Sequence, residues 1–211
     1  MGWVLDQHSP FFFGAEAIRK SGMRMRRFGA LCGAGAVALL LSACGGGQYR
    51  PVRDVPVKIG PPYVVRGVTY TPAADPGYDM LGYASWYGSE SGNRTANGER
   101  FRAGWVTAAH TSLPLPSYVE VTELDTGRTI VVRVNDRGPF SGRGRVIDLS
   151  RGAAEQLGVR AQGHVPVRVR LVDPPEKDRA RLRKGKAAPA RPSVPEATLR
   201  KLRAQLRAAG L

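Results

Sequence analysis

Cysteine is nearly absent from this chain, and its scarcity limits the kind of protein it can be. The two cysteines lie close together: Cys32 is near the start of the one strongly apolar stretch, and Cys44 comes just after its end. A disulfide framework needs cysteines spread through the folded region. The chain has only three histidines, and its Cys and His residues do not have the spacing of a metal site. We therefore predict neither a disulfide-stapled domain nor a metal centre, and we expect no cofactor.

Acidic residues are also few relative to basic ones. The 32 Lys and Arg against 17 Asp and Glu give a net charge of +15. That balance implies a polyanionic neighbour, which could be nucleic acid, a membrane surface or a cell-wall polymer. The sequence contains no aromatic-rich RNA-binding signature and no recognition-helix pattern. We therefore expect no nucleic-acid partner.

Long hydrophobic runs are missing apart from one near the N-terminus. A basic segment at residues 23–27 precedes an apolar run at 30–41, which is too short to span a bilayer. The run ends in Leu-Ser-Ala followed by Cys44, which resembles the lipobox of bacterial lipoproteins. The resemblance implies that residues 1–43 are a leader and signal peptide. The alternative is an ordinary secretory signal that happens to contain a cysteine.

A lipobox implies acyl chains on Cys44, and several such chains anchor a protein to a membrane almost permanently. Gly45, rather than Asp, follows the cysteine, which in Gram-negative lipoproteins usually permits export to the outer membrane. We therefore expect a cell-envelope protein, lipid-anchored at the outer membrane and facing the periplasm.

Residues 44–80 are rich in Pro and Gly and lack helical periodicity. We interpret this segment as the lipidated cysteine followed by a flexible tether, with a short strand at Tyr63–Val65. Such a tether would let the folded domain reach from the membrane towards the wall.

Residues 81–172 form the predicted core. The 26 Gly and 16 Pro of the chain argue against long helices. Alternating apolar residues and turn signals predict strands at Gly82–Tyr87, Tyr118–Glu123, Thr129–Val134, Arg145–Leu149 and Val165–Leu171. One short helix is expected, capped by Ser150, with Ala153, Ala154 and Leu157 facing the core and Gly158 at its end. About six short strands and one helix predict a mainly β protein with a closed barrel.

Residues 173–211 form a basic tail with eleven Lys and Arg and four acids, so 11 − 4 gives a net +7. We expect most of it to be disordered, because it has little apolar mass. Its last stretch could form an amphipathic helix capped by Ser193, with Leu199, Leu202 and Leu206 on one face. A solvated tail and a tail that docks on an anionic surface are equally supported.

Three acids and one histidine are candidates for chemistry. Glu99 follows a glycine in a turn-rich stretch, and Asp136 comes directly after an apolar strand. Asp148 lies between apolar residues, where an ionised carboxylate is costly unless it is hydrogen-bonded. His110 is the only histidine with a similar apolar lead-in.

Glycosidic bond cleavage needs a carboxylic acid for the leaving oxygen and a group that stabilises a positive sugar. Two loop-borne acids facing one groove would meet that need. Asp136 could instead be an ion-pair partner of Arg137. For Asp148 we prefer a structural role beside the following helix N-terminus.

Six motifs follow one another over nearly the whole core: Leu81-Gly82-Tyr83-Ala84-Ser85-Trp86-Tyr87-Gly88, Thr95-Ala96-Asn97-Gly98-Glu99, Thr107-Ala108-Ala109-His110, Leu113-Pro114-Leu115-Pro116-Ser117-Tyr118-Val119, Asn135-Asp136-Arg137-Gly138-Pro139-Phe140 and Ile147-Asp148-Leu149-Ser150. In this order they resemble the rare lipoprotein A (RlpA) family of septal-ring lytic transglycosylases.

The resemblance implies a six-stranded double-psi β-barrel related to expansins. It implies that Glu99 and Asp136 are the catalytic acids and that His110 lines the same groove. The other residues that we expect in the substrate groove are Trp86, Tyr87, Thr95, Asn135 and Arg137. The implied activity is non-hydrolytic cleavage of the MurNAc–GlcNAc β-1,4 bond, which leaves 1,6-anhydro-MurNAc ends on peptide-poor glycan strands. Partners would be peptidoglycan, the membrane, and cell-division or other envelope proteins.

Two departures from the family pattern stand out. Arg102 follows Phe101 where the family often has an acid. Many members also end in a peptidoglycan-binding SPOR domain, which we do not expect in the residues after Val172. Two other functions stay open: a non-catalytic, expansin-like glycan-binding lipoprotein, and a hydrolase of a related polysaccharide.

Overall fold

A computed structural model describes residues 52–88 and 92–211 of the chain. The expected signal peptide and Cys44 lie outside the described residues. The strands are β1 (Tyr63–Val65), β2 (Val68–Tyr70), β3 (Asp79–Tyr87), β4 (Thr107–Ala109), β5 (Ser117–Glu123), β6 (Thr129–Asp136), β7 (Arg145–Ser150) and β8 (His164–Leu171). The helices are α1 (Arg151–Leu157), α2 (Glu176–Arg183) and α3 (Glu196–Ala208). In the described ranges, the helices are all too short or too polar to cross a membrane.

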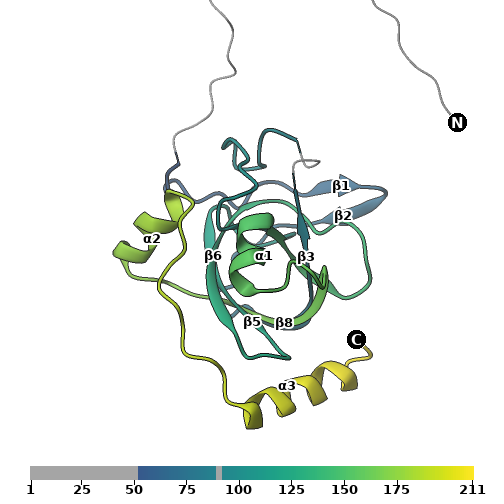
Figure 1. Cartoon of the computed structure of the whole chain (residues 1–211). Coiled ribbons are helices and arrows are strands. Elements are labelled where there is room, and N and C mark those ends of the chain that lie inside the picture. Colours follow the sequence, from purple (N-terminus) through teal and green to yellow (C-terminus); the bar gives the residue numbers. More distant parts are fainter. Residues whose placement is uncertain (1–51, 89–91) are drawn as a thin grey trace, which may run out of the picture. The chain divides into compact units, whose positions relative to one another are not determined.

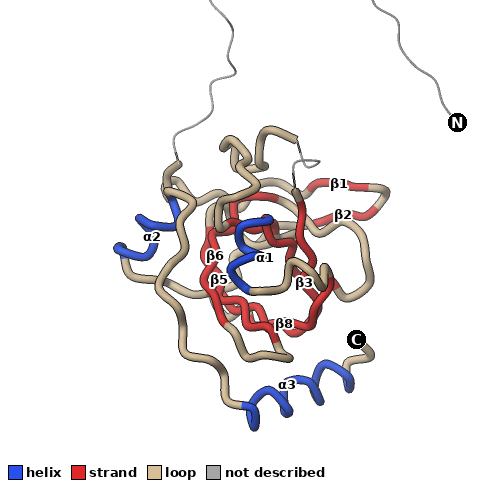
Figure 2. Tube along the Cα trace, viewed as in Figure 1, coloured by secondary structure: helices blue, strands red, loops and turns tan. Residues whose placement is uncertain are grey.

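Six strands close into a barrel in the order β3-β7-β4-β6-β5-β8. Figure 2 shows the strands of the chain in red. Strands β3 and β7 pair in parallel, as do β4 and β6, and the other neighbours pair antiparallel. The predicted mainly β, double-psi barrel fold is confirmed. Strand β4 was not predicted, because three residues are too few to show an alternating pattern.

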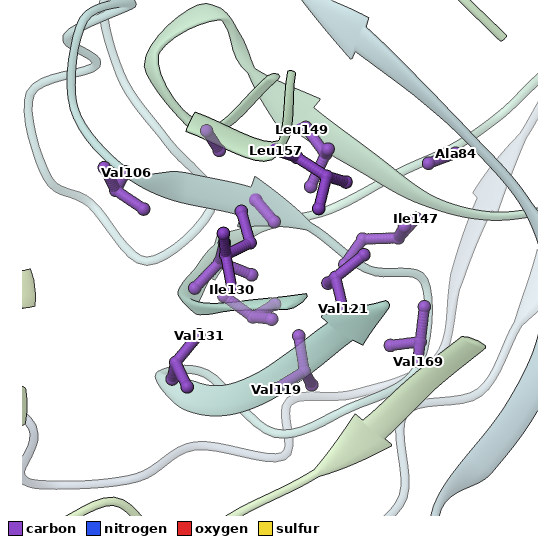
Figure 3. Close-up of a cluster of buried hydrophobic side chains, with 14 of the residues drawn as sticks. Ala84, Val106, Val119, Val121, Ile130, Val131, Ile147, Leu149, Leu157 and Val169 are labelled. Carbon is purple, nitrogen blue, oxygen red and sulfur yellow. The ribbon is translucent and has the colours of Figure 1, made fainter. Parts of the chain in front are cut away.

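The barrel encloses the main hydrophobic core. Figure 3 shows apolar side chains from the barrel strands and from α1 pointing towards one another, among them Val121, Ile147 and Leu157. Val131 and Val169 contribute from β6 and β8. Alternation is clear in β8, where Val165, Val167 and Val169 belong to this core, whereas β6 contributes the consecutive residues Ile130, Val131 and Val132.

Helix α1 forms as its sequence predicted. The Ser150 hydroxyl caps its first turn by accepting a hydrogen bond from the Ala153 amide. Gly158 ends the helix in the left-handed conformation, at φ +83°, and its N–H reaches the Ala154 carbonyl. Ala153, Ala154 and Leu157 are buried in the main core. Helix α1 contacts β3, β4, β6 and β7, and in the view of Figure 1 it is seen across the ring of barrel strands.

The expected flexible tether is ordered over its described part. Strands β1 and β2 form a hairpin whose two turn residues, Arg66 and Gly67, both have positive φ. Lys58 exchanges backbone hydrogen bonds with Leu115, 2.8 Å each way. The expectation of flexibility failed because these contacts join residues far apart in sequence and leave no periodic signal.

The tail is likewise not disordered. Leu182 of α2 joins the main core, while Leu199, Leu202 and Leu206 of α3 form a second cluster with Leu124. The apolar mass that the tail lacks is supplied by the outer surface of the barrel, where α3 runs along its lower edge in Figure 1. Pro195, not Ser193, is the N-cap of α3.

Candidate functional site

Asp136 is the last residue of β6, where the strand leaves the barrel. Its Oδ1 accepts hydrogen bonds from the Ala96 and Arg137 amides, each at 2.8 Å. Burial raises the pKa of the Asp136 carboxyl above its ordinary value, although these two amides act in the opposite direction. The negative charge of Glu99 raises the Asp136 pKa further. The raised pKa favours the protonated form of Asp136, which is the form that a general acid needs.

Asp136 opens onto a pocket of about 320 Å³. The residues around this space are Tyr87, Arg94, Ala109, Asp136, Arg137, Gly138, Phe140 and Asp148. Gly138 forms one wall with φ at +138°, a region that favours glycine. A Cβ there would lie 3.8 Å from Asp148 Oδ2. We call this space the Asp136 pocket.

Asp148 is the second carboxylate of the Asp136 pocket. Strand pairing places it there, since Ala109 of β4 is opposite Asp136 on one side and Asp148 on the other. Asp148 pairs with Arg145, whose Nη2 lies 2.5 Å from each of its two oxygens, and accepts a hydrogen bond from the Ser85 hydroxyl at 2.9 Å. The residue that caps the following helix is Ser150, not Asp148.

Glu99 lies behind the pocket rather than on it. Its side chain is only 3% exposed. Its Oε2 receives hydrogen bonds from Arg133 Nη1 and Asn135 Nδ2, both at 2.8 Å. Its Oε1 receives one from Asn97 Nδ2, also at 2.8 Å. Because Glu99 is enclosed and does not line the pocket, the structure does not bring the two predicted catalytic acids onto one surface.

A second, shallower space adjoins the Asp136 pocket through Arg94, which lines both. It measures about 270 Å³ and is lined by Lys58, Arg94, Thr95, Ala96, Asn97 and Gly98. Lys58 and Arg94 make the lining of this second space basic. Each space alone is near the small end of ligand pockets, so a chain-like ligand would have to occupy both.

His110 does not line the Asp136 pocket, where we expected it. Its ring is 2% exposed, and Nδ1 accepts hydrogen bonds from the Ser112 and Leu113 amides at 3.2 and 3.0 Å. The proton must then be on Nε2, which lies 2.8 Å from the Tyr78 hydroxyl. Burial, and secondarily the Arg137 charge, lowers the pKa of His110 to about 4. This histidine holds its loop in place as a neutral ring.

The other predicted groove residues divide into two groups. Tyr87 and Arg137 line the Asp136 pocket, and Thr95 lines the adjoining space. Trp86 and Asn135 line neither: Trp86 Nε1 donates to the Arg160 carbonyl at 3.1 Å, and Asn135 is buried against Glu99. Arg137 is also tied back, because its guanidinium donates to the Leu113 and Ile59 carbonyls at 2.5 and 3.0 Å.

Sequence reasoning missed Arg133, Arg94 and Phe140. Arg133 is 1% exposed and binds Glu99. The sequence could have indicated it, because a basic residue within the apolar strand Val131–Val134 needs a buried partner. Phe140 lines the pocket and packs edge-on against Tyr63 and Tyr70 of the β1–β2 hairpin. In the described ranges, no three His, Cys, Asp or Glu side chains gather as a metal ion would require.

The fold and the pocket define a double-psi β-barrel protein with an acidic site. Residues 79–169 match the family model described as lytic transglycolase. A relative from Pseudomonas aeruginosa (strain UCBPP-PA14), named endolytic peptidoglycan transglycosylase RlpA, is 45% identical and aligns over 69% of this chain and 53% of its own length. The chain belongs to the RlpA family.

Other similarities are partial. A Vibrio cholerae relative with the same name is 49% identical, and the alignment covers 56% of this chain and 46% of the relative. The chain thus spans about half the length of the curated relatives it matches. Among solved structures, the Streptomyces papain inhibitor matches 48% of this chain and 100% of its own, with 26% identity and a TM-score of 0.40.

Proposed function

We propose that this chain is an endolytic lytic transglycosylase that cleaves the MurNAc–GlcNAc β-1,4 bond of peptidoglycan, preferring peptide-poor strands. The observation that carries the proposal is the Asp136 pocket, in which a carboxyl with a raised pKa faces a second carboxylate. The names of the RlpA relatives support the same activity.

Asp136 donates the proton. As the bond between MurNAc C1 and the GlcNAc O4 breaks, the Asp136 carboxyl protonates that oxygen. The MurNAc ring then carries a positive charge at C1. Asp148 is the carboxylate that faces this charge, since it lines the same pocket. Together they supply the acid and the anionic stabiliser that glycosidic cleavage needs.

The second step closes the anhydro ring. The C6 hydroxyl of MurNAc attacks its own C1, and its proton returns to the now ionised Asp136, which restores the starting state. No water is consumed, and the product carries a 1,6-anhydro-MurNAc end.

Glu99 acts through Asp136 rather than on the sugar. Its carboxylate is held by Arg133, Asn135 and Asn97, and its negative charge favours the protonated form of Asp136. It is therefore a positioning residue in this scheme.

An enzyme that cleaves peptidoglycan has to be held near the cell wall. We propose that Cys44 is lipidated, that the chain is held at the outer membrane facing the periplasm, and that envelope or cell-division proteins are partners. The lipobox supports this. A Cys44→Ala variant should leave the membrane fraction, and a variant that stays there would refute the anchor.

Mass spectrometry of products from purified peptidoglycan tests the activity. We expect soluble glycans with 1,6-anhydro-MurNAc ends. Reducing MurNAc ends would show a hydrolase instead, and the release of no product would show a glycan-binding protein of the expansin type.

A further inference from the structure

The buried pair of Glu99 and Arg133 is completed from outside the barrel. Arg133 Nη1 lies 2.8 Å from Glu99 Oε2, and Nε lies 3.1 Å from Asp54 Oδ1. The remaining nitrogen, Nη2, donates to the Arg53 carbonyl at 2.7 Å. Every nitrogen of this 1% exposed guanidinium is thus used. Two of its three partners belong to the segment that precedes the barrel.

Asp54 also contacts two residues other than Arg133. The Tyr118 hydroxyl donates to both of its oxygens, at 2.8 and 2.9 Å, and Arg183 of α2 forms an ion pair with Oδ2. Burial alone would raise the pKa of Asp54, but the hydrogen bonds from Tyr118, Arg183 and Arg133 outweigh it and lower the pKa. Asp54 is therefore an anion at neutral pH.

These contacts form one line of alternating charge, Arg183–Asp54–Arg133–Glu99. The line starts in helix α2, which follows the barrel, passes through Asp54 in the segment that precedes the barrel, and ends behind the Asp136 pocket. Glu99, at the end of this line, is connected to the pocket through Asn97. The Asn97 side chain binds Glu99, and its backbone N–H donates to the carbonyl of Asn135, the residue before Asp136, at 3.1 Å.

We infer that Asp54 and Arg133 are positioning residues of the candidate site. The segment around Asp54, before the barrel, and helix α2 therefore contribute to the geometry of that site. This inference rests on the proposed function and names residues that deepen it. Both Asp54 and Arg183 lie outside residues 79–169, which match the family model.

A purely structural role explains this line poorly. Apolar residues of similar volume are often at least as stabilising as a buried ion pair, because desolvation offsets the attraction. An ion pair does fix orientation, since the planar guanidinium binds two carboxylates in set directions. The directions here orient the Glu99 carboxylate, which adjoins Asp136.

Asp54→Asn tests the inference, because it removes the charge and keeps the size of the side chain. The matched control is Asp75→Asn, an exposed acid of the same pre-barrel region whose local contact is with the Gly77 amide. A misplacement of about 1 Å can cost about 10²-fold in rate, so Asp54→Asn should lower kcat by about tenfold or more and leave KM nearly unchanged. Asp75→Asn should match the parent.

Two further measurements separate positioning from general damage. In a Glu99→Gln background, Asp54→Asn should cause no additional loss of kcat, because its effect passes through the Glu99 carboxylate. In NMR spectra, Asp54→Asn should shift the side-chain amide signals of Asn97 and Asn135, which both donate to Glu99, while most barrel backbone signals stay in place.

The outcomes are distinct. Parent-like kcat and parent-like amide signals in Asp54→Asn would overturn the inference, as would an equal further loss of kcat in the Glu99→Gln background. If the parent releases no anhydro products, the proposed function fails, and the two amide signals alone still decide whether Asp54 positions Glu99.

Discussion

Asp136 and Asp148 lie on the two strands that flank β4, each opposite Ala109. Neighbouring strands are about 4.8 Å apart, so the two acids start from backbones separated by about 10 Å and reach over one small residue. The space between them is the Asp136 pocket. This register makes Asp148, rather than Glu99, the second carboxylate that lines the pocket.

Asp148→Asn should lower the turnover of peptidoglycan by at least about 10²-fold, because the positive sugar loses its facing charge. The variant also breaks the ion pair with Arg145, so a control is needed. Asp79→Asn breaks the exposed pair of Asp79 with Arg168 and should keep parent activity. A fully active Asp148→Asn would return Asp148 to a structural role.

The carboxyl of Asp136 should cost the protein stability at neutral pH. Its folded-state pKa is raised above the ordinary 3.8, mainly by burial. Below that ordinary value both states hold the proton, and the contribution of this group to the free energy of unfolding is fully present. It is lost as the pH rises through the raised value, because only the unfolded state ionises freely.

Asp136→Asn should therefore have a higher Tm than the parent at pH 7, and the difference should shrink towards pH 4. Asn keeps an oxygen for the Ala96 and Arg137 amides. Thermal unfolding across pH measures this. A variant less stable than the parent at pH 7 would show that Asp136 is not strained by burial.

His110 should make the fold sensitive to mild acid. Its pKa is about 6.5 when unfolded and about 4 when folded, so stability is complete above pH 6.5 and is lost as the pH falls towards 4. At about 1.4 kcal/mol per pKa unit, the loss amounts to roughly 3 kcal/mol. His110→Gln should be less stable at pH 7 and should lose less stability on acidification. An equal slope in both proteins would contradict the buried neutral ring.

Helix α3 should stabilise the barrel. Leu199 is 2% exposed and packs in the cluster around Leu124, so Leu199→Ala should cost about 2–4 kcal/mol in the free energy of unfolding. Lys201→Ala, on the exposed side of the same helix, should change it little. Denaturant unfolding compares the two, and equal stabilities would mean that α3 does not dock.

Much of the fold could be predicted from the sequence, because its signals are local. Alternation marked the strands around Val121 and Val167, and a serine cap with a terminal glycine marked α1. The tail was mispredicted because Leu199 finds its apolar partners on a barrel residue far away in sequence, Leu124.

The site was predicted less completely, for a related reason. Asp136 was a candidate because it comes directly after an apolar strand, and its catalytic role was implied by the resemblance to the RlpA family. The roles of Glu99 and Asp148 depend on their partners: Arg133 lies 34 residues from Glu99, and Ser85 lies 63 residues from Asp148. No spacing rule within one motif indicates which acid faces the pocket and which is enclosed.

The most direct test of the account is the rate at which Asp136→Asn releases anhydro-MurNAc products from purified peptidoglycan. A general acid contributes about 10²–10⁴-fold, so the variant should lose at least about 10²-fold in rate while it stays folded and binds glycan. Asp125→Asn, which changes an exposed turn acid, should match the parent. Release by Asp136→Asn at the parent rate would contradict the assignment of Asp136 as the proton donor.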